Sequence, residues 1–98
     1  MILRIELSPL AQTDLKTITR AIAGRHGVGV ADRAFDRMAA VMAMLAEFPQ
    51  AGRPIPQNPA VWRYNTRHAR IIYRVKDTTL EIVAVIATSM SFRPGYEA

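Results

Sequence analysis

A run of positive charge without acidic residues occupies the middle of the chain. Between residues 48 and 76 there is no Asp or Glu, and the basic residues there are Arg53, Arg63, Arg67, Arg70, Arg74 and Lys76. The whole protein has a net charge of +5 from 13 Lys/Arg and 8 Asp/Glu, so the rest of the chain is close to neutral. A local block of one sign predicts a surface for an anionic or acidic partner, because a solvated surface usually mixes both signs.

Alternating residues place most of these arginines on one face of a predicted hairpin. Residues 61–67 and 69–76 alternate between apolar and polar positions, as two half-buried strands do. The apolar positions are Trp62, Tyr64, Thr66, Ile71, Tyr73 and Val75, and the opposite positions are Arg63, Arg67, Arg70 and Arg74. Like charges facing one another across a hairpin are destabilising. We therefore expect the four strand arginines to act as one binding group, and Arg53 to hold the preceding turn.

Candidate catalytic and metal-binding residues are few. The chain has no cysteine, which excludes thiol catalysis and cysteine-based zinc sites. His26 and His68 are far apart in sequence and lack ligand-type neighbours one helical turn away, so we expect no metal and no cofactor. Metal-free RNA cleavage needs a base, an acid and cations that stabilise the phosphorane. The strand arginines with Tyr73 or Tyr96 supply charge and a proton donor, whereas only His68 is close enough to serve as a base.

Length and composition predict one folded domain over residues 1–98. Half of the residues are hydrophobic, and 98 residues match the usual size of a single core. The longest apolar run covers residues 38–46, far short of the ~20 residues that a membrane-spanning helix needs. The first residues lack the apolar segment of a signal peptide. We expect a soluble, cytoplasmic protein, which the absence of cysteine also fits.

Periodicity predicts the elements that carry these residues. Residues 2–7 alternate as a strand, Ser8 and Pro9 are suited to cap and begin a helix, and a second helix covers residues 30–48. The apolar stripe of the first helix is Ala11, Leu15, Ile18 and Ile22, and the turn after it contains Gly24, Gly27 and Gly29. Residues 79–87 are nearly all apolar, as in a central strand covered on both sides. The order β-α-α-β-β-β predicts an α+β fold, with a helical hairpin packed on a mostly antiparallel sheet.

The second helix is apolar on every side after Arg37. A helix of this kind is buried all round, and two helices on one sheet cannot cover it fully. We therefore expect a partner to pack on this segment, where methionines suit an adaptable surface. The predicted contact residues are Met38, Val41, Met42 and Leu45. Tight alanine-rich packing within one monomer is the alternative.

Several motifs together resemble the RelE/ParE superfamily, the toxins of bacterial type II toxin–antitoxin modules. They are Leu7-Ser8-Pro9-Leu10-Ala11 with Asp14-Leu15 and Ile18, the segment from Leu45 to Phe48 followed by Pro49, Gly52 and Arg53, the strand Arg70-Ile71-Ile72-Tyr73-Arg74-Val75, and the strand Glu81-Ile82-Val83-Ala84-Val85-Ile86. Their order and spacing cover nearly the whole chain. The resemblance implies the fold inferred above.

Within that superfamily, ParE-like members inhibit DNA gyrase and RelE-like members cut messenger RNA on the ribosome. The segment Ser89-Met90 resembles the ParE version, although ParE-like chains often have His where Ala87 stands here. The resemblance therefore implies a non-catalytic gyrase inhibitor with a role in plasmid stabilisation. The implied target-binding residues are Ser89, Met90, Phe92 and Arg93. In the alternative, a ribosome-dependent messenger RNA endonuclease, the candidate catalytic residues are Arg63, Arg70, Arg74, Arg93 and Tyr96.

Both versions imply a protein partner, an acidic antitoxin of the ParD kind. Antitoxins of this superfamily usually lay amphipathic helices and a strand on the toxin. The expected contact residues are Met38, Val41, Met42 and Leu45 on the second helix and Arg63, Arg67, Arg70 and Arg74 on the hairpin. The chain is then part of a hetero-oligomer with its antitoxin. We expect no membrane contact and no sequence-specific DNA binding, because the basic residues lie on strands and not on a recognition helix.

Overall fold

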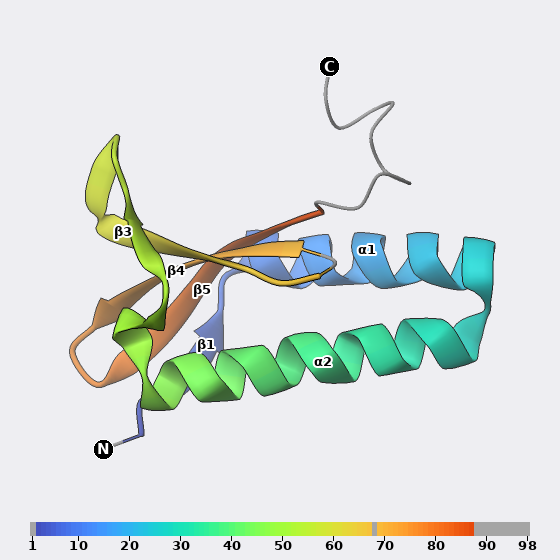
Figure 1. Cartoon of the computed structure of the whole chain (residues 1–98), viewed down its shortest axis with the longest axis horizontal. Coiled ribbons are helices and arrows are strands. Elements are labelled where there is room, and N and C mark those ends of the chain that lie inside the picture. Colours follow the sequence, from blue (N-terminus) through green and yellow to red (C-terminus); the bar gives the residue numbers. More distant parts are fainter. Residues whose placement is uncertain (1, 68, 88–98) are drawn as a thin grey trace.

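The computed structural model describes residues 2–67 and 69–87, in which two helices pack on one face of a five-stranded sheet (Figure 1). The elements are β1 (Arg4–Leu7), α1 (Pro9–His26), α2 (Val28–Glu47), the 3-10 turn η1 (Pro49–Ala51), β2 (Arg53–Ile55), β3 (Asn58–Asn65), β4 (Ala69–Lys76) and β5 (Thr79–Ala87). The strand order is β1-β5-β4-β3-β2; β1 runs parallel to β5 and the other pairs are antiparallel. The predicted α+β order is confirmed.

Ser8 caps the start of the first helix, and Gly27 follows its end. The Ser8 Oγ accepts a hydrogen bond from the Ala11 N–H at 3.0 Å, which satisfies an amide that has no partner within the helix. All four residues of the predicted stripe, from Ala11 to Ile22, are buried. Gly27 adopts a positive φ of 94° between α1 and α2. Gly24 and Gly29 lie inside the helices, so of the three glycines expected in the turn only Gly27 occupies it.

The second helix has two different faces. Met38, Met42 and Leu45 are at most 5% exposed and belong to the hydrophobic core with α1 and the sheet. The opposite face is formed by small exposed residues, Ala39, Ala40 and Ala43. At its end, the Ala46 carbonyl accepts a hydrogen bond from the Leu3 N–H at 2.9 Å, which ties α2 to the start of β1. The apolar run therefore consists of a core face and an exposed alanine face.

The central strands pair as the alternation predicts. Trp62 lies opposite Tyr73 and Tyr64 opposite Ile71 across β3 and β4, so these four side chains share the face that the helices cover. The rings of Trp62 and Tyr73 are 6.5 Å apart and tilted by 41°. A register shift between β4 and β5 follows Ile72. Strand β3 ends at Asn65, two residues before the predicted end at residue 67. The bounds of β4 and β5 match the prediction.

Two side chains from the start of the helical hairpin bind the backbone of β5 beyond the end of β1. The Ser8 Oγ donates to the Val83 carbonyl at 2.7 Å, and the Asp14 carboxylate accepts from the Val85 N–H at 2.9 Å. β5 is thus held by hydrogen bonds on this side after its parallel partner has ended. On the face away from the helices most of its side chains are only half-buried, so the predicted cover on both sides is wrong for the described residues.

The Tyr73 side chain joins the sheet to the connection after α2. It is fully buried, its hydroxyl donates to the Pro49 carbonyl at 2.7 Å, and the same oxygen accepts from the Gly52 N–H at 3.1 Å. A Cβ at Gly52 would collide with this hydroxyl and with the Arg63 carbonyl oxygen. Glycine is therefore required here by a close approach, and the turn leads directly into β2, a strand that the sequence did not predict.

Replacing Gly52 with alanine is expected to destabilise the fold by at least about 2 kcal/mol, because the new methyl group meets backbone that cannot move aside. Gly24→Ala is the matched control. Gly24 lies inside α1, and an added Cβ meets no atom within 4 Å apart from the backbone of its own helix and its chain neighbours, so that change should stabilise the protein by roughly 0.5–1 kcal/mol. Urea unfolding followed by circular dichroism measures both. Equal effects of the two substitutions would contradict the proposed close approach.

Tyr73→Phe is expected to cost about 1–3 kcal/mol, because it leaves the Pro49 carbonyl and the Gly52 N–H without their partner. Burial also raises the pKa of the Tyr73 hydroxyl. The folded state therefore holds this proton more tightly than the unfolded state, and the corresponding stability is full below about pH 10 and lost as the pH rises through the raised pKa. Unfolding free energies from pH 7 to 11 should fall less steeply for Tyr73→Phe than for the parent protein.

Candidate functional site

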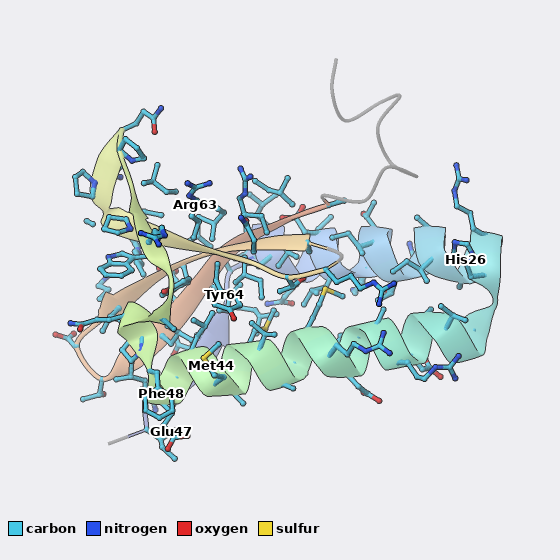
Figure 2. The ribbon with its side chains drawn as sticks, in the orientation of Figure 1. His26, Met44, Glu47, Phe48, Arg63 and Tyr64 are labelled. Carbon is cyan, nitrogen blue, oxygen red and sulfur yellow. The ribbon has the colours of Figure 1, made fainter. Side chains whose placement is uncertain are left out.

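Most of the strand arginines lie on the face of the sheet opposite the helices, here called the open face. Figure 2 shows Arg63 pointing away from α2, whereas its neighbour Tyr64 points toward α2. Because side chains alternate along a strand, residues directly opposite Arg63 on neighbouring strands share its face. Register pairs it with Arg53 on β2 and with Ile72 on β4. The open face is therefore basic on the side of β2 and β3.

Three arginines gather at that side of the sheet. Arg53 lies directly opposite Arg63, and Arg70 on β4 lies opposite Asn65. The Arg70 Nε donates to the Asn65 Oδ1 at 3.0 Å, which orients its guanidinium. A cleft of about 250 Å³, here called the arginine cleft, is formed by Ala51, Gly52, Arg53, Arg63, Tyr64 and Asn65. Its charged groups suit binding of an oxyanion.

Arg53 was predicted to hold a turn and is instead part of this cationic group. It follows Gly52, starts β2 and is exposed on the open face. One feature of the sequence indicated this role: Arg53 belongs to the same acid-free segment as the strand arginines. Its facing partner depends on the short strand β2 and its irregular register, which no local pattern reveals. Asn65, the residue that orients Arg70, was likewise not predicted.

Arg74 does not belong to the free cationic group. Its guanidinium forms a salt bridge with the Glu81 carboxylate on β5 at 2.5 Å. Glu81 in turn lies opposite Glu6 on β1, so the β1–β5 side of the open face carries acidic residues. The expectation that the four strand arginines act as one binding group is therefore wrong for Arg74. The acid comes from another strand, outside the acid-free stretch.

Arg67 also lies elsewhere. It occupies the bend after β3 and lines a groove of about 350 Å³ between α2 and β3. This α2–β3 groove is formed by Arg37, Met38, Ala40, Val41, Tyr64, Asn65, Thr66 and Arg67. Most of the groove surface is apolar. Arg37 lines it from the side of α2, and Arg67 lines it from the side of β3. The prediction that Arg67 shares the face of Arg63 and Arg70 is therefore wrong.

The predicted contact residues of the second helix fall into two groups, core residues and one residue that lines the α2–β3 groove. Met38, Met42 and Leu45 are core residues, so the prediction that they offer a surface to a partner is wrong for the chain as described. Val41 is half-buried and lines the α2–β3 groove next to the exposed Ala40. The physical reason is that methionine and leucine fill this small core, while alanines occupy the outer face. Composition alone does not separate these two uses of apolar residues.

The described residues provide cations on the open face but little acid–base chemistry beside them. Tyr73, a predicted proton donor, lies on the covered face, where its hydroxyl is bound to Pro49 and burial raises its pKa. His26 lies at the tip of the helical hairpin, away from Arg63 (Figure 2). Glu81 is engaged by Arg74. Among residues 2–67 and 69–87, no group of three His, Cys, Asp or Glu side chains is placed to hold a metal.

Further predicted residues fall outside the described part of the chain. These are the target-binding candidates Ser89, Met90, Phe92 and Arg93, the nuclease candidate Tyr96, and His68. Directly before residue 88, the last residues of β5 and one side of α1 form an apolar groove of about 450 Å³. It is lined by Leu10, Asp14, Thr17, Ile18, Ala84, Val85, Ile86 and Ala87. No described helix is long and apolar enough to cross a membrane.

Solved structures of toxin–antitoxin proteins share this fold. The chromosomal ParDE system from P. aeruginosa matches with a TM-score of 0.77 at 18% identity, covering 90% of this chain and 98% of the other. The toxin–antitoxin complex RelBE2 from Mycobacterium tuberculosis gives 0.67 at 18% identity, with 89% and 99% covered. A YoeB/ParE toxin from Agrobacterium tumefaciens gives 0.63 at 16% identity, with 89% and 100% covered. Identities this low relate the folds only.

The comparison of sequences is more specific. A search of curated proteins finds no match for the chain. The model of one protein family, described as the ParE toxin of the type II toxin–antitoxin system parDE, matches residues 5–92. This span includes both helices and all of the described strands except the first residue of β1. The chain therefore belongs to the ParE toxin family of type II toxin–antitoxin systems, within the RelE/ParE superfamily.

Proposed function

We propose that this toxin inhibits DNA gyrase and is neutralised by an acidic antitoxin. The observation that carries the proposal is the match to the ParE family over residues 5–92. The resemblance described in the sequence analysis implies gyrase as the target of ParE-like members. The chemistry of the described residues supports it. The open face holds Arg53, Arg63 and Arg70, but Glu81 is engaged by Arg74 and Glu6 lies on β1, at the other edge of the sheet. The Tyr73 hydroxyl is bound to Pro49 on the covered face. A binding role needs charge and shape only, whereas cleavage also needs a general base.

The ribosome-dependent endonuclease remains the second candidate, because a specific observation favours it. Three guanidiniums that gather on one sheet face are able to stabilise the negative charge of a phosphorane. RelE-like folds are also among the similar structures. Arg74 contributes less to this alternative than predicted, since Glu81 already neutralises it.

The test is to induce the toxin alone and follow two kinds of damage in the same cells. We expect chromosomal breaks and an SOS response while transcripts stay intact, and inhibition of supercoiling when the purified toxin is added to purified gyrase. A variant with alanine at Phe92 and Arg93 should lose this inhibition and still bind antitoxin, as expected for target-binding residues. Codon-spaced cuts in messenger RNA with intact chromosomes would assign the nuclease function instead.

The α2–β3 groove is the surface that we propose for an antitoxin helix. Its floor is apolar, with Ala40 and Val41 accessible along α2, and Arg37 and Arg67 supply positive charge from its two sides. An amphipathic helix with acidic flanks matches both features, because its apolar face is buried while its carboxylates meet the arginines. The proposed contact includes Val41 and Arg67, two of the residues predicted from the sequence.

Ala40→Glu is therefore expected to weaken antitoxin binding at least about tenfold, since it adds bulk and a carboxylate where an acidic helix is to dock. Ala39→Glu is the matched control, because Ala39 is exposed on the same helix and does not line this groove. Titration calorimetry with the antitoxin of the module measures both affinities, and thermal melts establish that both variants are folded. Equal weakening by the two substitutions would remove the groove from the interface.

A further inference from the structure

The arginine cleft holds positive charge that the described chain does not compensate. Arg53 and Arg63 face one another directly across β2 and β3, a repulsive arrangement that stabilises nothing in the free protein. Within residues 2–67 and 69–87, the single salt bridge is that of Arg74 with Glu81, so neither arginine of the facing pair has a carboxylate partner there. An anion that enters between the two side chains would offset this repulsion.

The surroundings of the pair are suited to one oxyanion group. Guanidinium groups form paired hydrogen bonds with carboxylate or phosphate oxygens. The cleft of about 250 Å³ has room for such a group, and Asn65 adds an amide at its wall. The bond from Arg70 to Asn65 fixes that amide and brings a third guanidinium to the same corner of the sheet. The binding groups therefore come from three neighbouring strands.

The neighbouring residues favour a polypeptide carboxylate over a nucleic-acid phosphate. Beside the cleft the register continues from Arg63 to the buried Ile72 and the half-buried Ala84, so the centre of the open face is apolar. Among residues 2–67 and 69–87 the aromatic rings of the central strands do not point to this face, because Trp62, Tyr64 and Tyr73 share the covered face. Beyond the apolar centre, Glu81 is paired with Arg74, and Glu6 on β1 repels a continuous phosphate backbone.

We infer that the arginine cleft binds an Asp or Glu side chain of an acidic protein segment, which lies across the open face with an apolar residue over the half-buried Ala84. The inference rests on the proposed antitoxin partnership and specifies its chemistry at a second surface, separate from the α2–β3 groove. The charges also set the direction of the segment. Its acidic end lies over β2 and β3, and an end bearing a basic residue suits Glu6 on β1.

The experiment titrates the purified full chain with a capped hexapeptide, Ala-Asp-Ile-Asp-Ile-Ala, and follows amide and arginine side-chain signals by NMR. The same peptide with Asn in place of Asp tests the need for carboxylates, and the oligonucleotide dT10 tests a phosphate backbone. We expect the Asp peptide to shift the signals of Arg53, Arg63 and Asn65, and the Asn peptide to leave them unchanged. Saturation by dT10 at lower concentration than by the Asp peptide, with the same signals shifted, would overturn the inference in favour of nucleic acid.

Variants separate this site from general attraction by a basic protein. Arg63→Gln should weaken binding of the Asp peptide at least about tenfold, and Arg63→Lys should recover only part of it, because lysine keeps the charge and loses the paired geometry. Arg20→Gln is the control with the same loss of charge, since Arg20 is exposed on α1, which packs on the covered face. Equal weakening by Arg63→Gln and Arg20→Gln would refute a specific cleft.

Two separate measurements distinguish failure of the cleft inference from failure of the proposed function. Co-expression with the antitoxin reports neutralisation, whereas the peptide titration reports the cleft alone. If the antitoxin neutralises Arg63→Gln as well as the parent chain and with unchanged affinity, the cleft is not part of the interface although the partnership stands. If the antitoxin binds neither protein, the proposed partnership itself is wrong.

Discussion

The hydroxyl of Tyr73 is the interaction on which the functional side of the sheet depends. It binds both ends of the turn after α2, the Pro49 carbonyl and the Gly52 N–H, from within the core. This bond fixes where β2 starts and therefore which residue faces Arg63. A buried side chain on the covered face thus determines how the guanidiniums on the open face are arranged. In the motif of Pro49, Gly52 and Arg53, the first two residues bind this hydroxyl and the third begins β2.

The two faces of the sheet have different physical roles. The covered face buries Ile71, Tyr73, Leu80 and Ile82 against the helices and provides the hydrophobic stabilisation of a small domain. The open face holds charges whose arrangement does not help the fold, apart from the Arg74–Glu81 pair, which is exposed and contributes little. Because the hydrophobic core cluster lies on the other side, substitutions on the open face, apart from the buried Ile72, should cost the core little.

Features decided by nearby residues were predictable from the sequence. The capping by Ser8, the buried stripe of α1 and the alternation of β3 and β4 all follow from spacing within a few residues, and the structure confirms them. Features decided by distant residues were not. The partner of Arg74 lies on β5, the partner of Arg53 depends on a three-residue strand, and Arg67 changes sides because β3 ends at Asn65. Likewise, apolar periodicity does not tell whether Met38 faces a core or another protein.

The parallel pairing of β1 with β5 has a consequence for the order in which the protein forms. Ser8 lies 75 residues before its hydrogen-bond acceptor Val83, and Asp14 lies 71 residues before Val85. A growing chain on the ribosome can form the helical hairpin early, but the sheet that supports the arginines closes only after β5 has emerged from the exit tunnel. Contacts of this long range slow the final step of folding. A fragment that stops before β5 should therefore be inert, and the cell is exposed to an active toxin only once that strand has been made.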